Sequence, residues 1–367
     1  MKIILVAGAR PNFMKIAPLV EALRPTPLVP LLVHTGQHYD RQMSQLFFEQ
    51  LGIPRPDVNL GVGSGSQAVQ TAEIMRAFEP VVLEYRPRAV LVVGDVNSTI
   101  ACGLVAVKLG VTLVHVEAGL RSGDRTMPEE INRILTDAIS DLLFCTERSG
   151  VENLRHEGVP GERIHLVGNV MIDTLLRHRQ AAASSGILQE LGVQPGQYAV
   201  LTLHRPANVD NPQVLMGLLE AVDHVQRDMP VVFPVHPRTR RNIEAHDGLS
   251  ARVGGMANLR LTPPMGYLDF LRLTSEARIV LTDSGGIQEE TTILKVPCLT
   301  LRNSTERPIT AEIGSNHVVG TQPERIVEAY RQVMAGEVRP VQTPPLWDGR
   351  AAERIADILV RSLGPDA

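Results

Sequence analysis

Three carboxylate residues follow short apolar runs in the first half of the sequence. They are Asp95 in VVGDVNST, Glu117 in VHVEAGLRSGD and Glu129 in MPEEINR. Carboxylates that lie close together repel, which raises the pKa of at least one, so that one can serve as an acid and another as a base. The trio therefore predicts proton-transfer chemistry. Each residue also has an alternative role when it is considered alone. Asp95 is then a helix cap, Glu117 pairs with Arg121, and Glu129 interacts with a helix dipole.

Basic residues and a histidine occupy comparable positions. Gly8 in GARPNFMK permits a tight turn, and Arg10 and Lys15 then place two cations near a helix amino terminus, which predicts an anion site. The alternative is that both are surface charges. His204 ends an apolar run in LTLHRPANVD. We expect it to reach the same ligand as the carboxylates, although a lone histidine is more often structural.

A second anion site is predicted in VLTDSGGIQEE, where Ser284, Gly285 and Gly286 lead from an apolar run into a helix. Backbone N–H groups and the positive helix end can face a phosphate there. Glu290 can accept hydrogen bonds from a ribose diol, or it is a solvated carboxylate. The sequence holds no GxxxxGK[ST], and GVGSGS at residues 61–66 lacks the third glycine of GxGxxG. Neither an ATPase nor an NAD enzyme is favoured.

Two further residues are candidates for nucleotide contacts. His236 in PVHPRTR follows another apolar run and predicts a phosphate or ribose contact, and Phe270 in GYLDFLRL lies either against a nucleobase or in the core. The 11 histidines include no HxH or HExxH spacing. We therefore predict no catalytic metal.

These residues need a parallel sheet to bring them together, and the sequence predicts an α/β fold. Apolar runs rich in Val, Ile and Leu alternate with segments of helical period. Ligands bind beyond the carboxyl ends of such strands. The predicted strands cover residues 2–6, 29–34, 89–93, 112–116, 142–145 and 163–167, and then 198–203, 231–235, 259–261, 278–282, 297–301 and 317–319.

Two domains with a cleft between them are expected, because the strand pattern lapses over residues 180–197 in a loop-rich stretch. The predicted domains are 1–180, which carries the carboxylates, and 181–345. Residues 346–367 form a tail in which Asp348 is the expected cap of a helix over about 350–362. We expect this helix to pack back on the first domain.

Length and composition agree with a globular protein. A chain of 367 residues favours two domains, and its net charge of −4, from 36 basic and 40 acidic residues, gives no sign of a nucleic-acid or membrane partner. The three cysteines lie far apart in apolar runs, which predicts reduced core residues. The apolar run at residues 3–7 is too short for a signal sequence. A cytoplasmic location follows as an expectation.

Taken together, the segments GARPNFMKIAPL, VVGDVNST, HVEAGLRSGD, MPEEINR, LTLHRPANVD, TDSGGIQEE and STERP resemble the non-hydrolysing UDP-N-acetylglucosamine 2-epimerases. The resemblance runs from Lys2 to the last helix. It implies a GT-B-like pair of Rossmann-type domains, the second binding UDP. It also implies reversible conversion of UDP-N-acetylglucosamine to UDP-N-acetylmannosamine, no external cofactor, a cytoplasmic homodimer, and a role in polysaccharide synthesis.

The resemblance also assigns residues. By their motifs, Asp95, Glu117, Glu129 and His204 match catalytic positions, Arg10 and Lys15 match substrate contacts, Ser284, Gly285, Gly286, Glu290 and Arg307 match diphosphate and ribose contacts, and Met265 and Phe270 match uracil contacts. Many relatives carry Glu in place of Asn12 and Ala207, and Thr in place of Asn97 and Ser98. Ala207 leaves open the allosteric activation by substrate that some relatives show.

The reaction that the family catalyses requires an indirect route, because C2–H of the sugar is not acidic. Loss of UDP from C1 together with the C2 proton gives 2-acetamidoglucal, and re-addition on the other face gives the epimer. Three alternatives remain open: a GT-B glycosyltransferase, a hydrolysing relative that releases N-acetylmannosamine and UDP, and a nucleotide-sugar-binding regulator without activity.

Overall fold

The computed structural model describes residues 1–8, 10–36, 50–337 and 339–364. The chain forms two compact units, of which unit 1 comprises Met1–Arg177 and Pro345–Ala367 and unit 2 comprises His178–Pro344. Each unit is an α/β fold built on one parallel sheet. Among the described residues, no helix is both long and apolar enough to cross a membrane.

The sheet of unit 1 is fully parallel and has seven strands within the described residues. Its central strands are almost entirely buried because helices cover both faces. The strand order is β3-β2-β1-β4-β5-β6-β7. The strands are β1 (Lys2–Ala7), β2 (Val29–His34), β3 (Val58–Asn59), β4 (Ala89–Val93), β5 (Thr112–Val116), β6 (Leu142–Cys145) and β7 (Ile164–Leu166).

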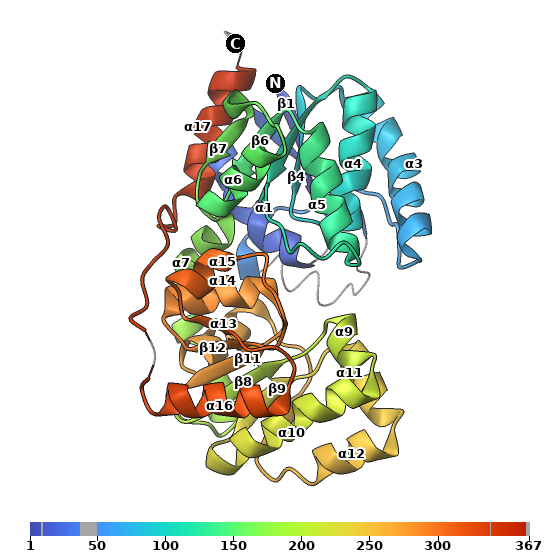
Figure 1. Cartoon of the computed structure of the whole chain (residues 1–367). Coiled ribbons are helices and arrows are strands. Elements are labelled where there is room, and N and C mark those ends of the chain that lie inside the picture. The colour runs from blue at the N-terminus through green and yellow to red at the C-terminus, as the bar shows by residue number, and fades with distance from the viewer. Residues whose placement is uncertain (9, 37–49, 338, 365–367) are drawn as a thin grey trace. The chain divides into compact units, whose positions relative to one another are not determined.

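The helices of unit 1 are amphipathic segments that pack on this sheet (Figure 1). On one face, apolar side chains of α3 and α4 enclose a core with β1, β2 and β4, and α5 packs beside α4. The helices are α1 (Arg10–Leu23), α3 (Gln67–Tyr85), α4 (Asn97–Lys108), α5 (Pro128–Ile139), α6 (Arg148–His156) and α17 (Ala351–Leu363). Helix α7 (Val170–Ala183) begins in unit 1 and ends in unit 2.

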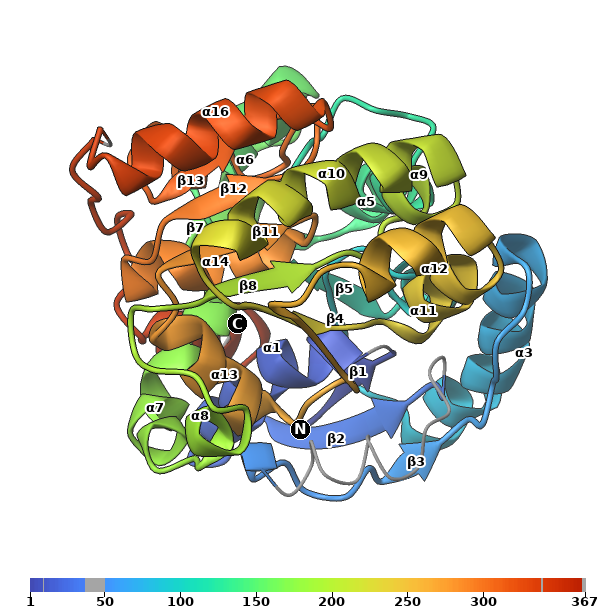
Figure 2. The ribbon, with the colours of Figure 1, turned by 90° about the horizontal axis from the view of Figure 1, so that it is seen from below.

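Unit 2 repeats the plan with a parallel sheet of six strands in the described residues, in the order β10-β9-β8-β11-β12-β13. Helices α10 and α16 lie side by side along it (Figure 2). The strands are β8 (Ala199–Thr202), β9 (Val231–Pro234), β10 (Leu259–Thr262), β11 (Ile279–Thr282), β12 (Cys298–Thr300) and β13 (Asn316–Val318).

The remaining helices are α8 (Ile187–Glu190), α9 (Pro206–Val209), α10 (Pro212–Asp228), α11 (Pro237–Glu244), α12 (Asp247–Gly254), α13 (Tyr267–Ser275), α14 (Gly285–Leu294), α15 (Pro308–Glu312) and α16 (Pro323–Met334). The predicted α/β class with parallel sheets is confirmed, and each predicted strand is present with ends that differ by at most two residues. The prediction missed β3, which has only two residues and no apolar run of its own.

The carboxyl-terminal segment is bound to unit 1. Helix α17 packs against α1, and the buried Trp347 donates a hydrogen bond from Nε1 to the Thr146 carbonyl at 2.9 Å. The prediction that Asp348 caps α17 is wrong. Asp173 of α7 accepts the backbone N–H groups of Ala351 and Ala352, at 3.1 and 2.7 Å, whereas Asp348 binds Arg354. This cap comes from a distant part of the chain, so local sequence could not reveal it.

Candidate functional site

The predicted site residues lie at the carboxyl ends of strands on both sides of the point where strand order reverses. In unit 1 this point lies between β1 and β4, and in unit 2 between β8 and β11. Such switch points are where ligands bind in open parallel sheets.

Glu117 forms a buried ion pair with Lys15 in unit 1. Glu117 follows β5 directly and has φ of 76°, a left-handed conformation that is costly for a residue with a side chain. Its amide and that of Ala118 both donate to the Phe144 carbonyl at 3.0 Å, which holds the turn. Lys15 is therefore not a surface charge, and Glu117 does not pair with Arg121.

Gly94 makes room for this ion pair. A Cβ at this position would lie 2.8 Å from Nζ of Lys15, and its φ of 67° also favours glycine. Gly94 is followed by Asp95, so the residue that admits the lysine also begins the loop that carries the second carboxylate. Asp95 does not cap α4, because the cap position is Val96.

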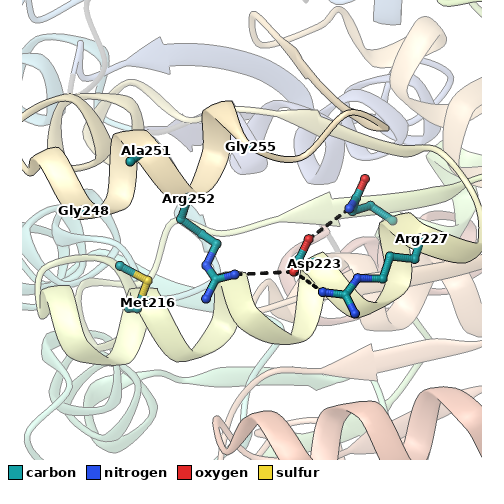
Figure 3. A pocket seen from close by; sticks show the side chains of 8 residues that line it. Met216, Asp223, Arg227, Gly248, Ala251, Arg252 and Gly255 are labelled. Atoms are coloured by element: carbon teal, nitrogen blue, oxygen red, sulfur yellow. Dashed lines mark hydrogen bonds and ion pairs between the residues drawn. The ribbon is translucent and has the colours of Figure 1, made fainter.

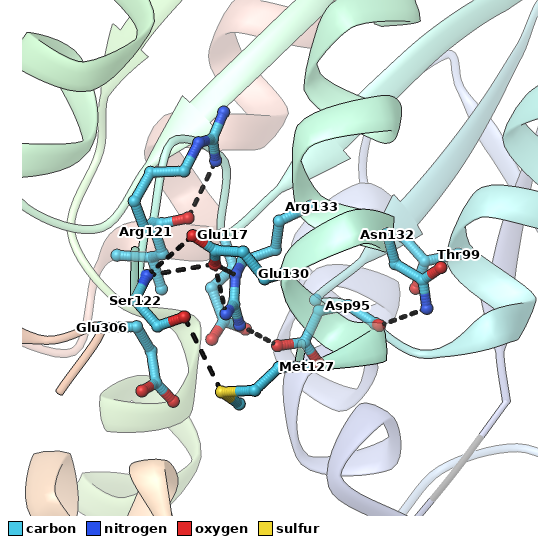
Figure 4. Close-up of polar contacts among 12 residues, drawn as sticks. Asp95, Thr99, Glu117, Arg121, Ser122, Met127, Glu130, Asn132, Arg133 and Glu306 are labelled. Atoms are coloured by element: carbon cyan, nitrogen blue, oxygen red, sulfur yellow. Dashed lines mark hydrogen bonds and ion pairs between the residues drawn. The ribbon is translucent and has the colours of Figure 1, made fainter. Parts of the chain in front are cut away.

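Asp95 is held by α5. Arg133 donates from Nη1 to Oδ2 of Asp95 at 2.5 Å, and Asn132 donates to the Asp95 carbonyl at 2.9 Å (Figure 4). The guanidinium of Arg133 is buried, whereas the Asp95 side chain is 25% exposed. Arg133 thus fixes the side chain of Asp95, and Asn132 fixes its backbone.

The two adjacent glutamates of α5 differ in their surroundings. Glu130 is buried, accepts the amides of Ser122 and Gly123 at 2.9–3.1 Å, and binds Arg133 at 2.6 Å (Figure 4). Burial would raise its pKa, but these hydrogen bonds and the Arg133 charge outweigh it and lower the pKa. Glu129 is only partly buried. The structure thus gives Glu130 a structural role and leaves Glu129 the more accessible carboxylate.

The first turn of α1 carries the remaining unit 1 candidates. Arg10 begins the helix, and its side chain lies outside the described part of the chain. Asn12 is buried, accepts the Gly8 amide and donates to the Val93 carbonyl, both at 3.2 Å. Asn12 therefore joins the β1–α1 turn to the end of β4.

His204 of unit 2 pairs with Asp283, which the sequence analysis did not single out. Nδ1 of His204 lies 2.8 Å from Oδ1 of Asp283, and the carboxylate also accepts the backbone amides of His204 and Arg205. Burial would raise the pKa of Asp283, but His204 and these amides lower it. The signal was present in the sequence, since Asp283 follows a buried strand and precedes the SGG turn.

The glycine turn at the start of α14 is packed against an arginine. Ser284 occupies the cap position of α14, and a Cβ on Gly285 would lie 2.4 Å from Nη1 of Arg307. Arg307 is buried and pairs with Glu289 at 2.6 Å and Glu306 at 2.7 Å. The positive end of α14, with Gly286 in its first turn, and this arginine thus lie together in unit 2.

Glu290 lies in the interior of unit 2. Burial and the neighbouring Glu289 charge raise the pKa of Glu290 to about 8, against a lowering by the Tyr267 hydroxyl. It is not a solvated helix-dipole carboxylate. At neutral pH it carries a proton in the ligand-free protein, so it can both donate and accept hydrogen bonds.

Met265, Phe270 and His236 are less defined as site residues. Met265 and Phe270 are partly buried and pack against the core around Leu273. His236 is the cap residue of α11 and accepts the Arg238 amide at 3.2 Å, with its ring centroid 6.2 Å from that of His204.

A pocket of about 570 Å³ lies elsewhere, between α10 and α12 (Figure 3). It is lined by Met216, Asp223, Gln226, Arg227, Gly248, Ala251, Arg252 and Gly255, and no predicted site residue lines it. Asp223 binds Arg227 at 2.8 Å and Arg252 at 3.4 Å. The charged side chains that line this pocket are thus paired with one another.

The comparisons with known proteins agree with the motifs. The family model described as UDP-N-acetylglucosamine 2-epimerase matches residues 22–360. The UDP-N-acetylglucosamine 2-epimerase of Methanocaldococcus jannaschii is 40% identical over 98% of this chain and 99% of its own length. The UDP-2,3-diacetamido-2,3-dideoxy-D-glucuronate 2-epimerase of Pseudomonas aeruginosa is 41% identical over 98% of this chain and 100% of its own.

Solved structures give the same result. The crystal structure of the Methanocaldococcus jannaschii UDP-GlcNAc 2-epimerase in complex with UDP-GlcNAc and UDP matches with a TM-score of 0.92 at 40% identity, over 98% of this chain and 100% of that one. The GT-B-like architecture expected from the resemblance is thereby supported. This chain belongs to the UDP-N-acetylglucosamine 2-epimerase family.

Proposed function

We propose that this protein interconverts UDP-N-acetylglucosamine and UDP-N-acetylmannosamine by elimination and re-addition of UDP. Family membership supports the reaction. The observation that carries the mechanism is the set of carboxylates at the switch point of unit 1, where Lys15 binds Glu117 and Arg133 binds Asp95. Each of these two carboxylates thus has a cationic side chain as a direct neighbour, and positioned carboxylates are suited to general acid–base catalysis.

The chemistry follows from the substrate. In the elimination, the C1–O bond breaks and its electrons leave with UDP, while a protein base takes the C2 proton, so that a C1–C2 double bond forms. The transition state has oxocarbenium character, which nearby carboxylates stabilise. In the return step, a proton is added to the other face of C2 and UDP re-adds at C1.

We assign the proton transfers at C2 to Glu117 and Glu129, with Asp95 positioning or assisting them. The two glutamates differ in their exposure to solvent, since Glu117 is buried against Lys15 and Glu129 is only partly buried. Two acid–base groups are needed because the proton leaves one face and returns to the other. Arg10 and Lys15 are proposed substrate contacts.

We assign binding of UDP to unit 2. The amino terminus of α14, at Ser284, Gly285 and Gly286, together with Arg307 suits the diphosphate. Glu290 is proposed for the ribose, Met265 and Phe270 for the uracil, and His236 for phosphate or ribose. His204, held by Asp283, would support departure and return of UDP.

The assembly and location belong to the same proposal, namely a cytoplasmic homodimer that needs no external cofactor and contributes to polysaccharide synthesis. A second candidate substrate is a UDP-2,3-diacetamido-2,3-dideoxyuronate, because the Pseudomonas aeruginosa relative named for it is 41% identical. The two sugars should be compared directly as substrates.

The test is incubation of the purified protein with UDP-N-acetylglucosamine in deuterium oxide, followed by proton NMR. We expect the second epimer to appear with deuterium at C2. Both isomers forming with the original hydrogen retained would refute the elimination route. Accumulation of UDP and free N-acetylmannosamine would identify a hydrolysing enzyme. A reaction that occurs only when an acceptor is added would identify a transferase. Binding of the nucleotide sugar without any turnover would identify a regulator.

A further inference from the structure

Helix α5 buries charge where a helix usually buries apolar side chains. Its fully buried residues are Glu130, Arg133, Thr136 and Asp137. The first two bind the 122–123 turn and Asp95, as described above. Asp137 binds a histidine, His115, that no step of the proposed reaction uses.

His115 lies in β5 and has no exposed surface. Its Nδ1 is 2.6 Å from Oδ1 of Asp137, and its Nε2 is 2.8 Å from the carbonyl oxygen of Gly94. A backbone carbonyl can only accept a hydrogen bond, so Nε2 must carry a hydrogen.

The carboxylate of Asp137 carries the contact onward to the next turn. Its second oxygen accepts the Gly119 amide at 3.0 Å and Nη1 of Arg121 at 2.7 Å. Asp137 therefore joins the ring of His115 to the backbone of the Glu117–Gly119 turn.

Arg121 extends this network toward the surface, where it binds Glu157 through Nε and Nη2 at 2.8 and 2.6 Å. Buried polar groups are stable only when they are hydrogen-bonded, and both ring nitrogens of His115 have partners.

We infer that His115 is a positioning residue, which ties the Gly94–Asp95 loop to the Glu117–Gly119 turn through Gly94 and Asp137. The inference rests on the proposed function, because both segments carry proposed catalytic carboxylates. One ring nitrogen fixes the carbonyl of the glycine that makes room for Lys15. The other fixes the carboxylate that holds Gly119, two residues after Glu117.

The geometry of the turn shows why such a connection is needed. Glu117 and Gly119 both have positive φ, of 76° and 80°. The turn must be held by its surroundings, because a residue such as Glu117 does not favour this conformation unaided. A small displacement of an acid–base group is costly, since about 1 Å can reduce a rate about 100-fold.

The first experiment measures the contact of His115 with Gly94 in the intact protein. Histidine side chains labelled with ¹⁵N are followed by long-range proton–nitrogen correlation spectra, which show which ring nitrogen carries a hydrogen. We expect Nε2 of His115 to carry one, because it faces a backbone carbonyl. A ring without a hydrogen on Nε2 would overturn the inference, whether or not the protein epimerises its substrate.

The second experiment separates the two contacts by substitution. His115→Gln places an amide donor near the Gly94 carbonyl and loses the Asp137 contact, whereas His115→Asn does the reverse. We expect kcat to fall about 10- to 100-fold in each, with KM and UDP affinity within about twofold of wild type. His165→Gln is the matched control, because His165 is a partly buried histidine of the same sheet, in β7.

Two kinetic outcomes would contradict the positioning role. One is an unchanged kcat in both His115 variants, and the other is a parallel loss of kcat and UDP affinity, which would indicate general destabilisation. If neither variant folds, the spectra of the wild-type protein decide. If the wild-type protein gives no epimer, the proposed function fails, and the spectra still test the contact of His115 with the Gly94 carbonyl.

Discussion

The buried carboxyl group of Glu290 should make unit 2 less stable as the pH rises. Its pKa in the folded protein is about 8, against an ordinary value of 4.5, because it is buried beside Glu289. Between these two pH values the folded state binds a proton that the unfolded state releases. Stability is therefore fully present below about pH 4.5 and is lost as pH rises toward 8.

The size of the effect follows from the difference of about 3.5 pKa units. At about 1.36 kcal/mol per unit, the loss is of order 5 kcal/mol over the whole range. In Glu290→Gln the side chain keeps its shape and cannot ionise, so this loss should disappear. The advantage of the variant over wild type should grow from near zero at pH 4.5 to several kcal/mol at pH 8.

The assay is urea unfolding at a series of pH values, followed by circular dichroism and by tryptophan fluorescence. The single tryptophan, Trp347, lies in unit 1, so its fluorescence reports that unit and acts as an internal control. Glu324→Gln, which removes an exposed carboxylate of unit 2, is the matched variant. Parallel pH profiles for wild type and Glu290→Gln would refute the assignment of a protonated, buried carboxyl group.

Three further outcomes are expected. Glu129→Gln should lower the rate of epimerisation by about 10²- to 10⁴-fold with UDP binding retained, whereas Glu130→Gln should mainly lower the melting temperature. Rates and melting temperatures of both variants that show the reverse pattern would reject the roles given to these two residues. Gly285→Ala should weaken UDP binding measured by calorimetry, because its Cβ would meet Nη1 of Arg307 at 2.4 Å, and unchanged affinity would show that the turn adapts. Burial raises the pKa of Asp173 to about 6, so the attachment of α17 to unit 1 should weaken as pH rises from about 4 to 6. Hydrogen exchange in α17 that does not change over this range would contradict the prediction.

The parallel sheets are predictable from the sequence because each main strand is an apolar run buried on both faces. The same logic places Asp95, Glu117 and His204 at strand ends, where the structure has them. It does not extend to β3, whose pairing with β2 depends on tertiary contacts more than on its own residues.

The hydrogen-bond and ion-pair partners of the site residues could not be predicted from the sequence. Nothing local distinguishes Glu129 from Glu130, yet one is partly exposed and the other is buried against backbone amides. The pairing of Lys15 with Glu117 joins residues 102 positions apart. Asp283 could have been singled out by its position after a strand, but its partner His204 is 79 residues away in the chain.

The charged inner face of α5 has a consequence for engineering and for natural variation. Exchanging buried ion pairs for well-fitting apolar side chains often leaves stability unchanged or raises it by about 1–4 kcal/mol. Replacing this ion pair by Arg133→Met together with Glu130→Leu can therefore raise the free energy of unfolding. They would also release Asp95 and the 122–123 turn, so that selection for thermal robustness alone should erode catalysis at this helix first.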